Sequence, residues 1–142
     1  MGFRKADKLY YQAEEEARVD LMGAFPCAED AQLYANHIVG RSWFREMAPD
    51  VVVEVRYVRR VQMCGTQRVR GKFVIELTLG RLCEGVLLHE LAHIPTYVPD
   101  LAHNDHGPAF AKAHLTILAH GVSIWSADQL AAALKKRGLR YE

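Results

Sequence analysis

Residues 87–93 read LLHELAH and residues 106–110 read HGPAF. In the first segment His89 and His93 are four residues apart, so a helix points both imidazoles to the same side, about 40° apart. Two histidines in this arrangement suit two corners of a tetrahedral zinc site. Glu90 lies about 100° round the helix from the first histidine, where it reaches a water molecule at the metal more easily than the metal itself. The segment therefore predicts a helix with an apolar back and one metal-binding edge.

The second segment positions a third ligand. Pro95 disfavours helical geometry in the residue before it, so we expect the first helix to end just after His93. Pro108 suits the first position of a new helix, and Gly107 allows a tight turn before that helix. His106 is the favoured third ligand because it is fixed between this turn and the helix. The alternatives that the loop offers are His103, Asp105 and Asp100.

The spacing also separates this pattern from two other zinc-site patterns. A metzincin has a glycine three residues and a histidine six residues after the second histidine, but Thr96 and Pro99 occupy these positions. A thermolysin-like site takes a glutamate from a helix about twenty residues further on. No acidic residue occurs between Asp105 and Asp128, which disfavours that pattern as well.

The rest of the chain reads as one α+β domain over residues 1–142. Its 142 residues are 50% hydrophobic and 25% charged, as in an ordinary globular domain. Helical composition or apolar spacing predicts helices over residues 5–22, 28–39, 87–93, 108–120 and 127–137. Alternation of side chains predicts strands over residues 51–58 and 73–79, with a turn region between Gly65 and Gly71. We therefore expect N-terminal helices, a small antiparallel sheet, the HExxH helix and C-terminal helices.

Charge and the termini limit the choice of partners. The net charge of +1 argues against a general nucleic-acid coat protein. Residues 41–72 nevertheless hold eight basic and three acidic side chains, the basic ones being Arg41, Arg45, Arg56, Arg59, Arg60, Arg68, Arg70 and Lys72. This segment is either a solvated face of strands and turns or a surface for phosphate or an acidic partner. Because no signal peptide or membrane span is evident, we expect a cytoplasmic protein without a membrane partner.

The two histidine segments resemble those of SprT-like zinc metalloproteases. They are more similar still to a family of small HExxH metallohydrolases found in actinobacteria and their phages. The resemblance implies a zincin-like minimal metalloprotease domain that binds one zinc ion through His89, His93 and His106, with Glu90 as general base. Ala109 stands where many relatives have glutamate. The zinc ribbon of the longer DNA-linked SprT proteins is also absent, because the three cysteines form no Cys-x-x-Cys pair.

These observations predict a zinc-dependent metallohydrolase, and a metallopeptidase acting on a peptide or protein in particular. Tyr97 and His103, on the loop over the site, are candidates for stabilising the oxyanion. Asp100 and Asp105 are candidates for orienting a ligand imidazole. Zincins bind extended peptide along an edge strand that precedes the motif helix. The strand over residues 73–79 stands in that place, which nominates as substrate-binding residues Phe73, Ile75 and Leu77.

Two other functions remain open at this stage. A non-catalytic binding module for a host protein or nucleic acid would use zinc only for stability, with a fourth protein ligand such as His103 closing the site. A metal-dependent nuclease would use the basic segment over residues 41–72, and its nucleic-acid binding would depend steeply on salt concentration.

Overall fold

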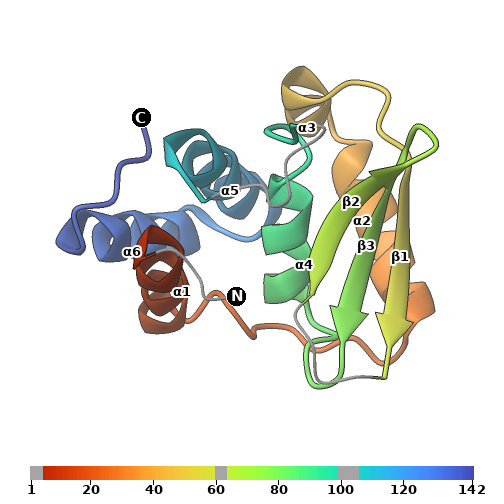
Figure 1. Ribbon diagram of the computed structural model, residues 1–142, viewed down its shortest axis with the longest axis horizontal. Helices are drawn as coiled ribbons and strands as arrows, with labels where there is room; N and C mark the ends of the chain where they lie inside the picture. Colours follow the sequence, from red (N-terminus) through yellow and green to blue (C-terminus); the bar gives the residue numbers. More distant parts are fainter. Residues whose placement is uncertain (1–4, 60–63, 99–105) are drawn as a thin grey trace.

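The computed structural model describes residues 5–59, 64–98 and 106–142 (Figure 1). Within these ranges the helices are α1 (Lys5–Ala17), α2 (Ala28–Val39), α3 (Ser42–Met47), α4 (Glu84–Ala92), α5 (Pro108–Gly121) and α6 (Ile124–Lys136). The strands are β1 (Val53–Val58), β2 (Gly65–Val69) and β3 (Lys72–Thr78). This mixture of helices with a small sheet confirms the predicted α+β class. None of the described helices is long and apolar enough to cross a membrane.

The sheet has the strand order β1-β3-β2. Strand β1 runs parallel to β3, with Val55 opposite Ile75, whereas β2 runs antiparallel to β3. Arg70 and Gly71 form the tight turn between β2 and β3, with φ angles of 51° and 82°. The prediction of a purely antiparallel sheet is therefore wrong. The turn predicted between Gly65 and Gly71 is also wrong over most of its length, because β2 is mostly exposed and lacks the apolar alternation that reveals a strand.

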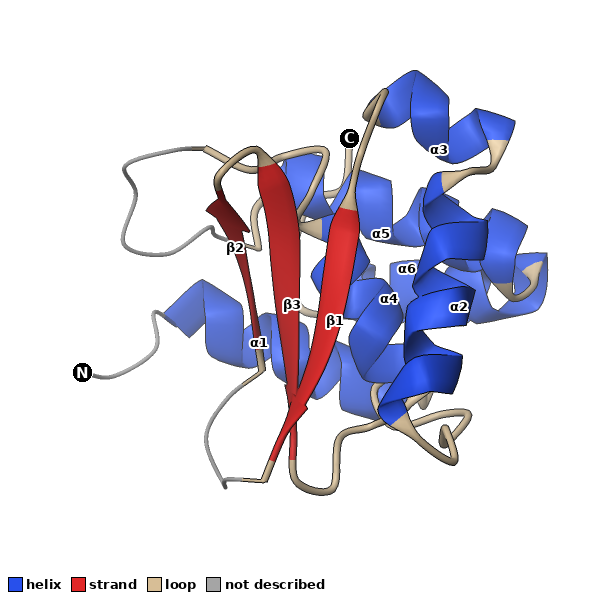
Figure 2. Cartoon of the chain, turned by 90° about the vertical axis from the view of Figure 1, so that its right-hand side faces the viewer, coloured by secondary structure: helices blue, strands red, loops and turns tan. Residues whose placement is uncertain are grey.

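Helices cover one face of the sheet (Figure 2). Helices α2 and α4 pack directly on it, and the strand register points apolar side chains at them, namely Val53, Val55, Ile75 and Leu77. Beyond α4 lie α1, α5 and α6 (Figure 1). Because α4 has neighbours on both sides, every one of its residues from Leu87 to Ala92 is buried. The helix that carries the HExxH motif is thus the centre of the domain.

Several helix boundaries differ from the predicted ones for local reasons. Helix α2 has the predicted bounds, but α1 ends at Ala17 because Arg18 adopts a left-handed conformation, with φ of 58°. Helix α3 was not predicted, since six residues carry too little periodicity to distinguish a helix from a turn. Helix α4 begins at Glu84, three residues earlier than expected.

Gly85 explains how α4 begins next to the segment that follows α1. A Cβ atom on this residue would lie 2.3 Å from the carbonyl oxygen of Val19, so only glycine permits this approach. The first amide groups of α4 then find backbone partners. The amide of Glu84 donates to the carbonyl of Gly23 at 2.8 Å, and that of Gly85 donates to the carbonyl of Met22 at 3.0 Å. These bonds satisfy helix donors that would otherwise be buried without partners.

The described part of the basic segment does not lie on one face. Arg56 and Lys72 both pair with Glu54 on the sheet face that points away from the helices. Arg68 lies opposite Phe73 in the register, with its guanidinium 5.7 Å from the centre of that ring. Its side chain therefore points to the other face of the sheet. Arg60 lies outside the described residues.

Candidate metal centre

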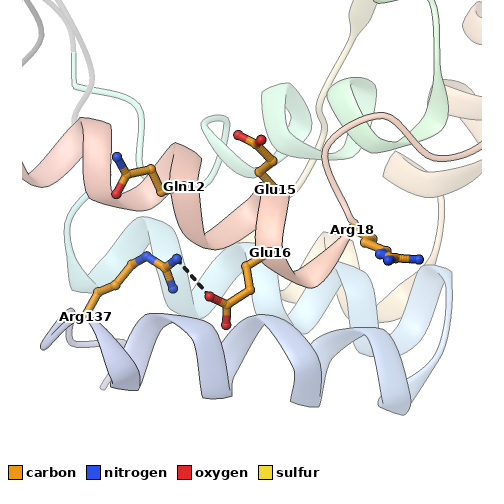
Figure 3. Close-up of a pocket in the computed structure, with 5 residues that line it drawn as sticks. All are labelled: Gln12, Glu15, Glu16, Arg18 and Arg137. Atoms are coloured by element: carbon orange, nitrogen blue, oxygen red, sulfur yellow. Dashed lines mark hydrogen bonds and ion pairs between the residues drawn. The ribbon is translucent and has the colours of Figure 1, made fainter.

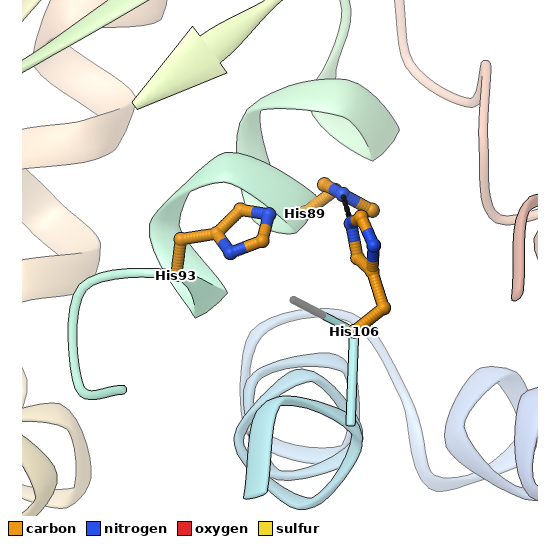
Figure 4. A group of neighbouring side chains, drawn as sticks. All are labelled: His89, His93 and His106. Carbon is orange, nitrogen blue, oxygen red and sulfur yellow. Dashed lines mark hydrogen bonds between the residues drawn. The ribbon is translucent and has the colours of Figure 1, made fainter. Parts of the chain in front are cut away.

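Three histidines lie close together where the end of α4 meets the start of α5 (Figure 4). His89 lies in the last turn of α4, His93 caps the C-terminal end of that helix, and His106 lies two residues before Pro108, the first residue of α5. One nitrogen of each imidazole lies within 4.8 Å of those of the other two. The structure thus brings together the three residues that the sequence nominated as metal ligands.

The two prolines act as the sequence predicts. Helix α4 ends at Ala92, two residues before Ile94, whose helical geometry Pro95 disfavours. Pro108 occupies the first turn of α5 and Gly107 is its N-cap in an extended conformation. The start of a new helix therefore fixes the third histidine opposite the end of the first helix.

Two carboxylates determine which nitrogens of His89 and His106 carry protons. Glu14 Oε2 lies 2.6 Å from Nδ1 of His89, and Asp7 Oδ1 lies 2.9 Å from Nδ1 of His106. An ionised carboxylate only accepts hydrogen bonds, so each Nδ1 must donate a proton. In a neutral imidazole the other nitrogen, Nε2, is then a bare lone pair. The two Nε2 atoms face each other at 3.0 Å, so their lone pairs can share a proton or bind one metal ion.

The geometry fits a metal ion of the size of zinc. Zinc–nitrogen bonds of about 2.0–2.1 Å in a tetrahedron place two ligand nitrogens about 3.3 Å apart. The distance between Nε2 of His89 and Nε2 of His106, 3.0 Å, is within a few tenths of an ångström of this value. The ring of His93 lies 5.2 Å and 4.9 Å from the other two ring centres.

Burial controls the protonation of the third histidine. Desolvation, followed by the positive charges of the neighbouring histidines, holds the pKa of His93 well below its usual range. Burial also tends to lower the pKa of His89, but the charge and hydrogen bond of Glu14, together with Glu90, raise it overall. Burial therefore favours the neutral form of His93, which is the form that can bind a metal ion, whereas Glu14 and Glu90 favour the protonated form of His89.

Glu90 lies beside this cluster and is also buried, with 6% of its surface exposed. The hydroxyl of Thr66, on β2, lies 2.7 Å from Oε1 of Glu90 and 3.0 Å from its backbone oxygen. Burial raises the pKa of Glu90, although the charge of His89 and the hydroxyl of Thr66 partly offset this effect. A carboxyl group with a raised pKa can both take up and release a proton near neutral pH.

Helix α1 supplies a group of residues that the sequence analysis missed. Asp7, Tyr10, Tyr11 and Glu14 follow the spacing i, i+3, i+4, i+7, and they share one face of the helix. The Tyr11 ring stacks on His89 with centres 5.7 Å apart, and the Tyr10 ring stacks on His106 at 5.3 Å. The helical spacing of two acids and two tyrosines was a signal in the sequence, but nothing local linked it to the histidines.

The remaining predicted site residues have different outcomes. Tyr97 lies against the sheet, where its hydroxyl accepts a hydrogen bond from the amide of Arg68 at 3.3 Å and its ring contacts Phe73. His103, Asp100 and Asp105 lie outside the described residues.

The strand over residues 73–79 was predicted to bind substrate as an edge strand, and its placement at an edge is wrong. This strand is β3, which pairs with β1 on one side and β2 on the other, so it is not an edge. Ile75 and Leu77 are fully buried in the core and cannot contact a substrate, while Phe73 is half-buried. The edge strands of this sheet are β1 and β2.

Together, the described residues provide three imidazole nitrogens, a buried carboxylate beside them and two carboxylates behind them. Such a set can hold a borderline-soft divalent cation such as zinc and place a base next to it. Hard cations such as magnesium prefer oxygen ligands, so the donor atoms disfavour them. Comparison with protein-family models, with curated proteins and with solved structures finds no match to this chain.

Proposed function

We propose that this protein is a zinc-dependent metallohydrolase that cleaves peptide bonds. The observation that carries the proposal is that Nε2 of His89 and Nε2 of His106 lie 3.0 Å apart, while a carboxylate contacts Nδ1 of each ring. With His93 they form a set of three nitrogen ligands. Three protein ligands are typical of catalytic zinc sites, which leave the fourth position to water or substrate.

Glu90 is the proposed general base. When bound, zinc lowers the pKa of a water molecule toward about 7. Glu90 then takes a proton from the attacking water and delivers it to the leaving amine. Thr66 donates a hydrogen bond to Oε1 and so holds this oxygen of the carboxylate in place. Its burial, with a raised pKa, lets the same group accept the proton and release it again.

Tyr11 is the proposed donor to the oxyanion. Its ring is stacked on His89 and lies edge-on to His106 at 5.1 Å. Burial and the nearby carboxylates of Glu90, Glu14 and Asp7 raise its pKa, so the hydroxyl keeps its proton and can donate it in a hydrogen bond.

A Tyr11→Phe variant should therefore lose about 10²–10³ in kcat, the usual effect of removing one oxyanion donor. We expect KM and zinc content to change little, because the ring that stacks on His89 remains. Tyr57→Phe, on β1, is the matched control and should have wild-type kinetics. Steady-state kinetics with a fluorogenic peptide measure both variants, and a wild-type rate for Tyr11→Phe would exclude this role.

Strand β2 supports peptide as the substrate class. It pairs with β3 on one side, and among the described residues nothing pairs with its other edge. Thr66 lies on this strand and contacts Glu90 directly. An extended peptide that added a strand to β2 would therefore pass beside the general base.

Zinc loading and chelation test the proposal. We expect one zinc ion per chain by elemental analysis, and hydrolysis of an unfolded protein such as casein. A strong zinc chelator should stop the hydrolysis, and added zinc should restore it. We expect this reversal because the helices at the site, α4 and α5, pack into the core and should stay folded without the metal. Circular dichroism should show that the metal-free protein keeps its helices.

The opposite result would favour the binding module. A protein that holds one zinc ion per chain, hydrolyses nothing and unfolds on chelation has a structural site. A fourth protein ligand, visible as a closed coordination shell by X-ray absorption, would agree with that outcome.

A further inference from the structure

The face of α1 that meets the histidines is connected to two of the three proposed ligands. Asp7 Oδ1 lies 2.9 Å from His106 and Glu14 Oε2 lies 2.6 Å from His89, in both cases at Nδ1. These contacts join residues that are 99 and 75 positions apart in the chain. Helix α1 therefore holds one ligand from α4 and the ligand that precedes α5 at the same time.

Glu14 also reaches a second buried histidine. Its Oε2 lies 3.9 Å from Nε2 of His114, and the Tyr10 hydroxyl lies 2.8 Å from Nδ1 of the same ring. Among the described residues Nε2 of His114 has no hydrogen-bond partner, although the ring is fully buried. Burial, followed by the charges of His89 and His106, holds the pKa of His114 well below its usual range.

The charges of the two carboxylates supply a physical reason why a metal ion would bind beside them. Glu14 is 2% exposed, and the side chain of Asp7 is 14% exposed. Burying an ionised carboxylate is costly unless a cation compensates it. Neutral imidazoles accept a metal ion but carry no charge of their own that would compensate these two carboxylates. A divalent cation bound to the histidines balances both.

We propose that α1 is the positioning element of the metal centre, with Asp7 and Glu14 orienting His106 and His89, and that metal binding and the docking of α1 stabilise each other. The proposal rests on the zinc site proposed above. Carboxylates that accept the Nδ1 proton fix the tautomer and the ring orientation of a ligand histidine. If the docked helix strengthens metal binding, thermodynamic linkage requires that the bound metal stabilises the docked helix by the same free energy.

The opposite face of α1 provides the matched control. There Glu16 accepts a hydrogen bond at 2.9 Å from Arg137, the residue that follows α6, beside a pocket that these two residues line with Gln12, Glu15 and Arg18 (Figure 3). Glu16→Gln changes a carboxylate on the same helix without touching the histidines.

Zinc affinity, measured by competition with a chromophoric chelator at fixed pH, tests the proposal. We expect Glu14→Gln and Asp7→Asn each to weaken zinc binding by about 10–100-fold, and Glu16→Gln to leave it unchanged. Both test variants keep the size and an acceptor oxygen of the original side chain. If Glu14→Gln fails to fold, Asp7→Asn still decides the question, because Asp7 is more exposed and lies at the start of the helix.

Hydrogen exchange supplies a second measurement that a purely structural role of α1 would not affect. Adding zinc to the wild-type protein should slow amide exchange in α1 by more than in α2. The reason is that both carboxylates that contact the proposed ligands belong to α1. Wild-type zinc affinity in both variants, or α1 exchange that zinc does not change, would overturn the proposal while leaving the metal site intact. A wild-type protein that binds no zinc would overturn both.

Discussion

Replacing Glu90 by glutamine is expected to lower kcat by about 10²–10⁴, the contribution typical of a general acid–base group. Glutamine has the same shape, and its amide oxygen still accepts the Thr66 hydrogen bond that Oε1 accepts at 2.7 Å. It cannot take a proton from water, however. Zinc content should therefore stay at one ion per chain. The decisive result is a variant that binds zinc normally but has lost hydrolysis.

The stability of this variant should be unchanged or slightly higher. Glu90 is 6% exposed, so a neutral amide removes the cost of burying a charge. The control is Glu84→Gln, in the same helix, where the carboxylate accepts a hydrogen bond from Tyr34 at 2.5 Å. We expect it to affect thermal stability and to leave kcat alone. Hydrolysis at the wild-type rate by Glu90→Gln would show that the carboxylate is not the base.

Replacing Phe110 by alanine is expected to lower the free energy of unfolding by about 3–5 kcal/mol. This ring is 1% exposed and forms the floor of the histidine cluster, with its centre 4.3 Å from that of His93 and 4.8 Å from that of His106. It also contacts Tyr10 of α1 at 5.2 Å. The alanine variant leaves a cavity where three helices meet, so zinc binding should weaken as well.

Urea unfolding of the zinc-free protein measures the stability change, and chelator competition measures the affinity. Phe110→Leu is the conservative variant and should lose clearly less stability, since it keeps much of the buried volume. Phe73→Ala is a control on the sheet, where the ring is half-buried against Tyr97 and contacts no histidine of the site. Equal losses for Phe110→Ala and Phe73→Ala would contradict the role of the first ring as the floor.

The sequence predicted best where the evidence is local. Helix α2 has the predicted bounds, because its apolar residues repeat with the period of a helix. Short or exposed elements lacked such a pattern, which is why α3 and β2 were missed. The order of the strands is not local either. The same alternating residues over 73–79 suit an edge strand or a central one, and only the pairing with both neighbours decides between them.

By itself, the sequence determined that His89 and Glu90 lie on one helix with His93 at its C-terminal end, because helical spacing is set by hydrogen bonds within a few residues. It also determined that His106 stands at the start of the next helix. Only the tertiary structure decided which side chains complete the site. Asp7 and Glu14 reach their histidines across 99 and 75 residues of chain. Contacts at such distances in the chain depend on how helices pack, and no periodicity in one segment records them.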